Sequence, residues 1–525
     1  MSQSLDQEFG SIRSFLWPVH RHELRKLLPM FLILFLICFT HSVLRNMKDS
    51  IVVTASGAEV IPFIKVWVML PTAVLLTYLF ARLSNSYSQE RVFYIMISGF
   101  LFFFGLFAFV LYPLRDVLHP VNYAAHLQTL LPAGFKGLIA MACNWTFTGF
   151  YVLSELWGSI ILTVIFWGFA NEVTKMSEAS RFYGVFGIGA NLAAVFSGQV
   201  AILLTFDTFN PSLPFGKDAW EQTIMSIVGL LIFLGLITIG LFYWLNRNVL
   251  TDSSYSGLHQ NRNNIKKKHK LSMTESFKYL SQSKYLIYIA MMVVGYSFVI
   301  NLVEVVWKDQ LKQLYASPSD YNTYMNNLTS IMGVISTITA FFMAKIISKC
   351  GWTGTALITP VIMFVTCAGF FFFLLFQGSF SESFMLFFGA SPLAVAVFFG
   401  SAQNCLSKAA KFSVYDTTKE MAFIPLDHES KLKGKAAIDG VGSRLGKSGG
   451  SLLHQGLLMF FATVSASAPY VAVILLSVIV LWIVATRLLG IEFNKIVAEK
   501  EGQLETQDQS SEKWELSSEA GTVNA

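Results

Sequence analysis

The chain has few charged residues and few cysteines for its length. Only 13% of its 525 residues are Asp, Glu, Lys or Arg, against about 25% in soluble domains. Together with 54% hydrophobic residues and a mean hydropathy of +0.55, this scarcity excludes an ordinary soluble protein. The five cysteines are odd in number and never form a CxxC pair. We therefore expect no disulfide framework, no metal site and no cofactor.

The hydrophobic residues lie in long runs that recur along nearly the whole chain. A helix needs about 20 apolar residues to cross a bilayer, whereas the strands of a membrane barrel alternate over about ten. The sequence therefore predicts an all-α membrane protein embedded in a lipid bilayer. No small-residue cleavage site follows the first run, so we expect this run to be retained as the first transmembrane span.

Twelve transmembrane helices are predicted, in two halves of six. The predicted spans are residues 27–45, 60–82, 91–112, 144–170, 182–205 and 222–245, followed by 284–306, 325–348, 353–377, 384–407, 436–463 and 469–489. The first half is thus 27–245 and the second 284–489. The eleventh span is the least apolar of the twelve.

Basic residues concentrate in the connections between spans rather than in one patch, which argues against a nucleic-acid partner. The loop 246–283 carries seven Lys or Arg against two acidic residues, and such loops lie on the cytoplasmic side. Because each half crosses an even number of times, we expect the N-terminal segment 1–26 and the tail 490–525 to be cytoplasmic as well. The polar tail from Glu499 onward is predicted to be disordered.

The two halves resemble weak internal copies. SVLRNMKD (Ser42–Asp49) and SFVINLVE (Ser297–Glu304) share Ser, Asn and an acid in register at an offset of 255 residues, and Gln199 faces Gln455 at an offset of 256. A nearly constant offset at two distant places favours a parallel six-plus-six duplication. This is the arrangement of major-facilitator-like transporters.

The stretch GVGSRLGKSGG (440–450) resembles a nucleotide phosphate loop. A GxxxxGK[ST] loop needs a glycine five residues before Gly446 and a strand before the loop. The required position holds Val441, and no strand-like run precedes it, so the phosphate-loop interpretation fails. We predict instead a transmembrane helix in which Arg444 and Lys447 share one face.

Glycines and alanines spaced by four predict close helix packing on two of the spans. In this stretch they are Gly442, Gly446 and Gly450, and in the fifth span they are Ala190, Ala194 and Gly198.

Ionisable residues deep inside apolar runs are the strongest candidates for a functional site, because each costs about 2.5 to 3.5 kcal/mol to place in the bilayer. Lys65, Glu155 and Glu304 lie in such positions. Tyr151 and Asn301 lie about one helical turn before Glu155 and Glu304, respectively, and are candidates with them.

A second group of charges lies near the ends of the predicted spans. Arg45, Lys48 and Asp49 share one face at the end of the first span, and Lys408 and Lys411 follow the tenth. Contact with a ligand and simple snorkelling to the membrane surface both explain such positions.

Four segments in chain order carry a family resemblance. They are IPFIKVWVMLP (61–71), FYVLSELWGS (150–159), INLVEVVWK (300–308), and KEMAFIPLDHESKLKGKAAID with the later GKSGG (419–450). These segments resemble the signature segments of the nucleotide transporter family, the ATP/ADP translocases of plastids and obligate intracellular bacteria. The resemblance covers essentially all twelve spans.

The resemblance implies exchange of external ATP for internal ADP and phosphate, which imports host ATP across the inner membrane of an intracellular bacterium. It implies that Lys65, Glu155, Glu304 and Lys447 serve nucleotide transport, with Arg444 tuning the choice of substrate. We expect the protein to act as a monomer.

Other functions remain open at this point. A related transporter could import GTP, UTP or NAD, by exchange or with protons carried on Glu155 or Glu304. A membrane-bound ATPase is disfavoured by Val441 and by the lack of a soluble nucleotide-binding domain. A non-transporting nucleotide receptor would leave the duplication unexplained.

Overall fold

A computed structural model describes residues 19–174, 176–250, 283–379, 389–426, 434–435, 438 and 442–522. The described residues form helices and turns, with no strand among them. Ten of the described helices are long and apolar enough to cross a membrane. The predicted all-α membrane class is therefore confirmed.

The first half contains three short π-helical segments (η2, η3 and η5) within otherwise α-helical spans. Its elements are η1 (Arg21–Glu23), α3 (Leu24–Ser56), α4 (Val60–Phe63), η2 (Ile64–Met69), α5 (Leu70–Ser86), α6 (Gln89–Leu106), η3 (Phe107–Leu111), α7 (Arg115–Leu118), α8 (Val121–Leu130), η4 (Ala133–Phe135), α9 (Lys136–Cys143), α10 (Trp145–Trp157), η5 (Gly158–Phe166), α11 (Trp167–Val173), α12 (Met176–Leu203) and α13 (Ala219–Asn248).

The second half begins after the basic loop, most of which lies outside the described residues. Its elements are α16 (Lys284–Leu314), α17 (Pro318–Leu375), η7 (Gln377–Ser379), α19 (Pro392–Ala410), η8 (Lys411–Tyr415), α20 (Asp416–Ala422), α22 (Ser443–Phe461) and α23 (Val464–Thr522). The element α17 comprises two helices that meet at Gly351, whose φ of 65° suits glycine. This junction separates the predicted eighth and ninth spans.

The helices α19 and α22 correspond to the predicted tenth and eleventh spans, although neither is among the ten apolar helices. Each packs against a longer helix of the second half, α19 against α17 and α22 against α16. Polar residues such as His454 and Gln455 lower the hydropathy of α22, and both are buried by neighbouring helices rather than facing lipid.

Two sequence expectations need correction. The first span was expected to end near residue 45, but α3 continues to Ser56, so Lys48 and Asp49 lie well inside it and are each only 2% exposed. The tail was expected to be disordered, but the backbone of α23 continues as a helix to Thr522. The tail is rich in Glu and Gln, which favour helix even without a packed face.

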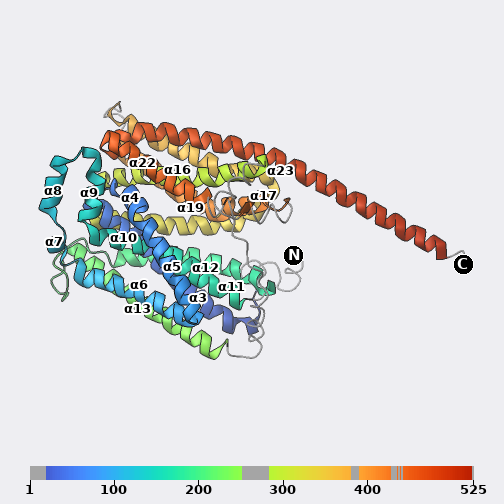
Figure 1. The fold of residues 1–525 in the computed structure, drawn as a ribbon, viewed down its shortest axis with the longest axis horizontal. Coiled ribbons are helices and arrows are strands. Elements are labelled where there is room, and N and C mark those ends of the chain that lie inside the picture. The colour runs from blue at the N-terminus through green and yellow to red at the C-terminus, as the bar shows by residue number, and fades with distance from the viewer. Residues whose placement is uncertain are drawn as a thin grey trace.

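The two halves lie side by side (Figure 1). Helix α3 begins at the end of the bundle from which α23 projects, and α8 and α9 cover the opposite end. We call these the terminal end and the far end. Helices α3, α12 and α17 pack against one another and join the halves along one side, while α22 meets α4, η2 and η4 on the other.

One of the two predicted small-residue faces packs between the halves. A side chain at Gly198 of α12 would collide with Ser330 and the backbone of Asn326 on α17. The other face packs within the second half, since a Cβ at Gly446 would lie 2.7 Å from Val294 O of α16. The same spacing therefore serves an interface between halves in α12 and helix packing within one half in α22.

The two glutamines that align in the internal repeat, Gln199 and Gln455, make equivalent contacts in the structure. Gln199 Nε2 donates to Ser330 Oγ at 2.9 Å, which links α12 to the second half. Gln455 Nε2 donates to Pro62 O at 2.9 Å, which links α22 to the first half. Each glutamine thus crosses from its own half to the other, as expected for equivalent positions in two copies.

At the far end, the short helix η4 of the first half lies directly against α22. A Cβ on Gly134 would be 2.5 Å from Met459 Cα and 2.6 Å from Met459 O. Gly134 therefore permits a backbone contact that closes this end of the bundle.

Substitution of Gly134 by alanine is expected to prevent full closure of the far end and to reduce transport several-fold, because neither backbone can yield without moving a helix. Gly99→Ala is the matched control, since no atom lies within 4 Å of a Cβ at Gly99. Labelled-substrate uptake into vesicles measures both. Equal activity of the two variants would contradict the assigned contact.

Candidate functional site

Charged residues of the first half meet in the middle of the bundle. Lys48 Nζ lies 3.0 Å from Asp49 Oδ1 and 3.2 Å from Glu155 Oε2. The same ammonium lies over the ring of Tyr151, 3.7 Å from its centroid. A cation held by two carboxylates and an aromatic face is well compensated for its burial.

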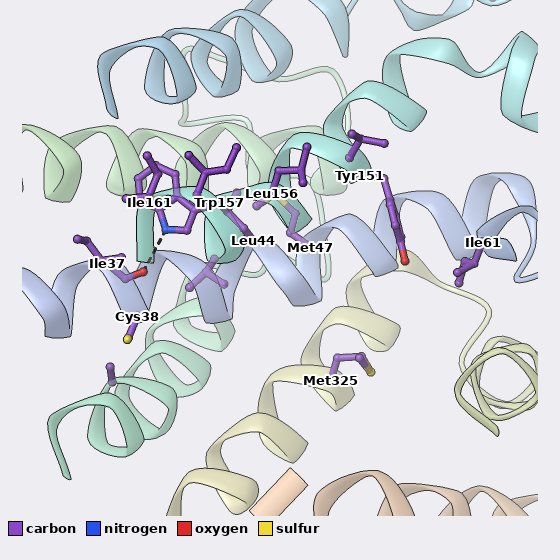
Figure 2. Packing of buried hydrophobic residues seen from close by; sticks show 14 of the residues in the cluster. Ile37, Cys38, Leu44, Met47, Ile61, Tyr151, Leu156, Trp157, Ile161 and Met325 are labelled. Carbon is purple, nitrogen blue, oxygen red and sulfur yellow. Dashed lines mark hydrogen bonds between the residues drawn. The ribbon is translucent and has the colours of Figure 1, made fainter. Parts of the chain in front are cut away.

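Apolar packing fixes the helices that carry these residues (Figure 2). Trp157 of α10 is buried and donates its indole N–H to Ile37 O of α3 at 3.2 Å. Leu44 and Met47 on α3 and Leu156 on α10 belong to the same buried cluster. This contact sets the distance between α3 and α10 at which Lys48 reaches Glu155.

Two further lysines connect the halves. Lys308 Nζ of α16 lies 2.8 Å from Asp49 Oδ2 and 3.0 Å from Glu304 Oε1. Lys65 Nζ of η2 lies 3.2 Å from Glu304 Oε2. Thus each half supplies a lysine to an acid of the other half, and Lys308 is only 1% exposed.

Asn301 joins α22 to this network. Lys65 Nζ donates to Asn301 Oδ1 at 2.5 Å, and Asn301 Nδ2 donates to Lys447 O at 2.8 Å. The Lys447 side chain is itself exposed. Lys65 lies in a π-helical segment, a local widening of the helix that is frequent at functional sites.

The positive and negative charges of the ion-paired network are equal in number, but the surrounding region carries additional positive charge. Three lysines (48, 65 and 308) face three acids (49, 155 and 304). Arg45, Lys408 and Lys447 form no ion pair among the described residues, yet they lie within electrostatic reach of the network. Lys408 interacts with Arg45, and Lys447 interacts with Glu155 and Lys411. The site as a whole is therefore cationic.

Part of the network is open to a ligand. The side chain of Glu155 is 38% exposed, although its partner Lys48 is buried. Together with the exposed Lys447, this leaves charged atoms available in the middle of the bundle. A solvated cationic site between two helical halves suits a polyanionic substrate.

The structure brings most of the candidate residues together. Those in direct contact are Lys48, Asp49, Lys65, Tyr151, Glu155, Asn301 and Glu304, with Lys447 attached through its backbone. Arg45 and Lys411 are electrostatic neighbours. Arg444 is exposed in the first turn of α22, and no hydrogen bond or ion pair between described residues joins it to the network.

Lys308 was not among the site residues predicted from the sequence. The seventh span was expected to end at residue 306, whereas α16 continues to Leu314 and places Lys308 in the interior. The spacing of Lys308 from Glu304 could have identified it, because residues four apart share one face of a helix.

The glycine-rich stretch is helical where it is described. Gly446, Lys447 and Ser448 all lie within α22, whereas Gly440 and Val441 lie outside the described residues. The backbone N–H groups of a phosphate loop must be free to bind phosphate, whereas those in the interior of a helix are already bonded.

Two six-helix halves with a charged site between them form a major-facilitator-like fold. The solved bacterial homologue of the iron transporter ferroportin, in an inward-facing state, shares this fold with a TM-score of 0.54 and 12% identity, covering 90% of this chain and 99% of that chain. This likeness confirms the predicted fold class.

The chain belongs to the TLC ATP/ADP transporter family, whose model matches residues 2–493. ADP,ATP carrier protein 1 of Chlamydia pneumoniae is 45% identical, over 97% of this chain and 99% of that protein. The chloroplastic ADP,ATP carrier protein 1 of Arabidopsis thaliana is 40% identical, over 93% of this chain and 77% of that protein. The predicted family is confirmed, and the chain is a multi-pass membrane transporter rather than an enzyme.

Proposed function

We propose that this protein exchanges ATP for ADP across a bacterial membrane by alternating access at the charged site between its halves. The observation that supports this mechanism most directly is the excess of cations around a network whose own charges cancel. The relatives named ADP,ATP carriers support the choice of nucleotides.

The surplus cations explain why transport should occur by exchange. Arg45, Lys408 and Lys447 form no ion pair with a described residue, so their charges are left to water or a ligand. Closing the site while it is empty would remove that water at a cost of several kcal/mol per ion. The phosphates of a bound nucleotide supply the missing negative charge, so reorientation is favoured only in the loaded carrier.

The balanced network changes the role expected for Lys65. This lysine already has Glu304 and Asn301 as partners, so a phosphate must displace Glu304 to bind it. Glu304 keeps Lys308 after that displacement. Substrate binding at Lys65 therefore leaves no carboxylate stranded in the interior.

Several finer features belong to the same proposal. Phosphate leaves together with ADP, which balances part of the charge of the incoming ATP. The basic loop supports a cytoplasmic position for that loop and for both termini. We further place the protein in the inner membrane of an intracellular bacterium, acting as a monomer on host ATP.

The test is uptake of labelled ATP by vesicles that contain the purified protein. Loading the vesicles with ADP is expected to stimulate uptake at least about tenfold over empty vesicles, because an unloaded site would have to bury its cations. An imposed proton gradient should not replace the internal ADP. ADP should compete better than GTP, UTP or NAD.

Two results would reject the proposal. Equal uptake by empty and loaded vesicles would exclude exchange. Uptake driven by a proton gradient alone, with stronger competition by GTP, UTP or NAD, would establish the alternative importer instead.

A further inference from the structure

Lys308 is the only cation in the described ion pairs that binds one acid from each half. Its ammonium lies between Asp49 of α3 and Glu304 of α16. The two carboxylates that it joins are consequently within about 6 Å of each other, a distance at which like charges repel strongly in a poorly solvated interior. We propose that Lys308 is a positioning residue that latches the two halves together between the site and the far end.

The internal repeat shows why one lysine serves both acids. Asp49 and Glu304 occupy equivalent positions in the two copies, 255 residues apart. At the same offset, the counterpart of Lys308 is Val53, which is buried and cannot form an ion pair. The symmetry is broken here, so a single ammonium lies between the two acids and offsets the repulsion between them across the halves.

The position of this latch follows from the direction of the helices. Asp49 and Lys308 both lie in the later part of helices that start at the terminal end and finish at the far end. The polar contacts of Asn46 with Asn326 and Thr329 join the halves at a similar depth. Opening the far end must therefore break the pair between Lys308 and Asp49.

Opening changes the charges in a selective way. Asp49 keeps Lys48, and Glu304 keeps Lys308, because these pairs lie within one half. Lys65 alone loses its described partners, since Glu304 and Asn301 both belong to the second half. The latch thus links opening of the far end to release of a cation that can receive an anion. This inference goes beyond the proposed function, because it holds whichever anionic substrate is carried.

The experiment measures how readily the far end opens in the purified full-length protein in lipid nanodiscs. A reporter cysteine replaces Leu458, a buried residue whose backbone lies against Gly134, in a background without the five native cysteines. A second reporter at Leu231, buried within the first half, detects general loosening. The measured quantity is the rate of alkylation by a maleimide.

Lys308→Met is expected to raise alkylation at Leu458→Cys by about tenfold or more, because the unlatched acids repel, and to leave Leu231→Cys unchanged. Lys26→Met is the matched control. Lys26 is as buried as Lys308 and pairs with Glu178, but both belong to the first half. It should not accelerate alkylation at Leu458→Cys.

Two further variants separate the latch from a folding defect. Lys308→Arg retains the charge, so the rate of alkylation at Leu458→Cys should remain close to that of the parent protein. Asp49→Asn breaks the ion pair with Lys308 while Lys308 keeps Glu304. It should also accelerate alkylation at Leu458→Cys, and it provides the test of the latch if Lys308→Met does not fold. Unchanged alkylation at Leu458→Cys in folded Lys308→Met and Asp49→Asn, or equal acceleration at both reporters, would overturn the latch. Neither result bears on whether loaded vesicles exchange ATP for ADP.

Discussion

Lys65→Gln is expected to lower ADP-dependent uptake of labelled ATP by about 100-fold, the size of a lost charge-assisted contact to phosphate in a poorly solvated site. Lys65 is the cation whose partners change when the halves separate, and glutamine removes its charge while retaining much of its length. Glu304 would still have Lys308 as a partner, so the fold should survive. Uptake by vesicles containing equal amounts of protein measures the effect.

Lys136→Gln provides the control for this substitution. Lys136 also forms an ion pair, 3.0 Å from Glu59, but its side chain is 55% exposed. Exposed pairs contribute only about 0 to 1 kcal/mol, so uptake should remain close to that of the parent protein. Normal uptake by Lys65→Gln would remove this lysine from the substrate site.

Lys48→Met is expected to lower both the stability of the protein and its exchange activity. Lys48 is the only described cation that pairs with Glu155, and it also pairs with Asp49. Removing one partner from a buried ion pair typically costs about 3 to 5 kcal/mol. The cost here should lie at or below the lower end of that range, because Asp49 keeps Lys308 and the side chain of Glu155 is 38% exposed. Tyr151 would also lose the cation on its ring. We expect a lower Tm and the loss of exchange.

The comparison with Lys26→Met separates stability from transport. Lys26 is equally buried and lies 2.7 Å from Glu178, away from the central network. Its substitution should lower the Tm by a similar amount while folded protein still exchanges nucleotides. If Lys48→Met kept both its Tm and its exchange rate, the central role of Lys48 would be refuted.

The charged residues of the interior show which parts of the site can be predicted from the sequence. Lys65, Glu155 and Glu304 were identified because each interrupts a long apolar run, and burying a charge in a bilayer requires a reason. Lys308 was missed because the predicted span ended two residues before it. Helix ends are weakly encoded, since a span can continue past its apolar run when other helices cover it.

Arg444 and Lys447 are residues that the sequence predicts for the site but whose side chains form no ion pair in the network. Both were expected to face the substrate from one side of the same helix. In the structure, Lys447 joins the network through its backbone carbonyl, whereas Arg444 in the preceding turn has no described link to it. Which part of a helix face meets a site depends on how the helix packs, and the glycines at 446 and 450 set that packing against α16.

The class of this protein, its two-half architecture, its family and most of its interior charges could be predicted from the sequence. Hydropathy and motif spacing are local properties of the chain, so they can be recognised without coordinates. Coordinates were needed to show that Lys48, Lys65 and Lys308 pair with three acids and that Lys308 contacts an acid of each half. Pairing between charges depends on distances across helices that are far apart in sequence, and the packing of those helices sets these distances.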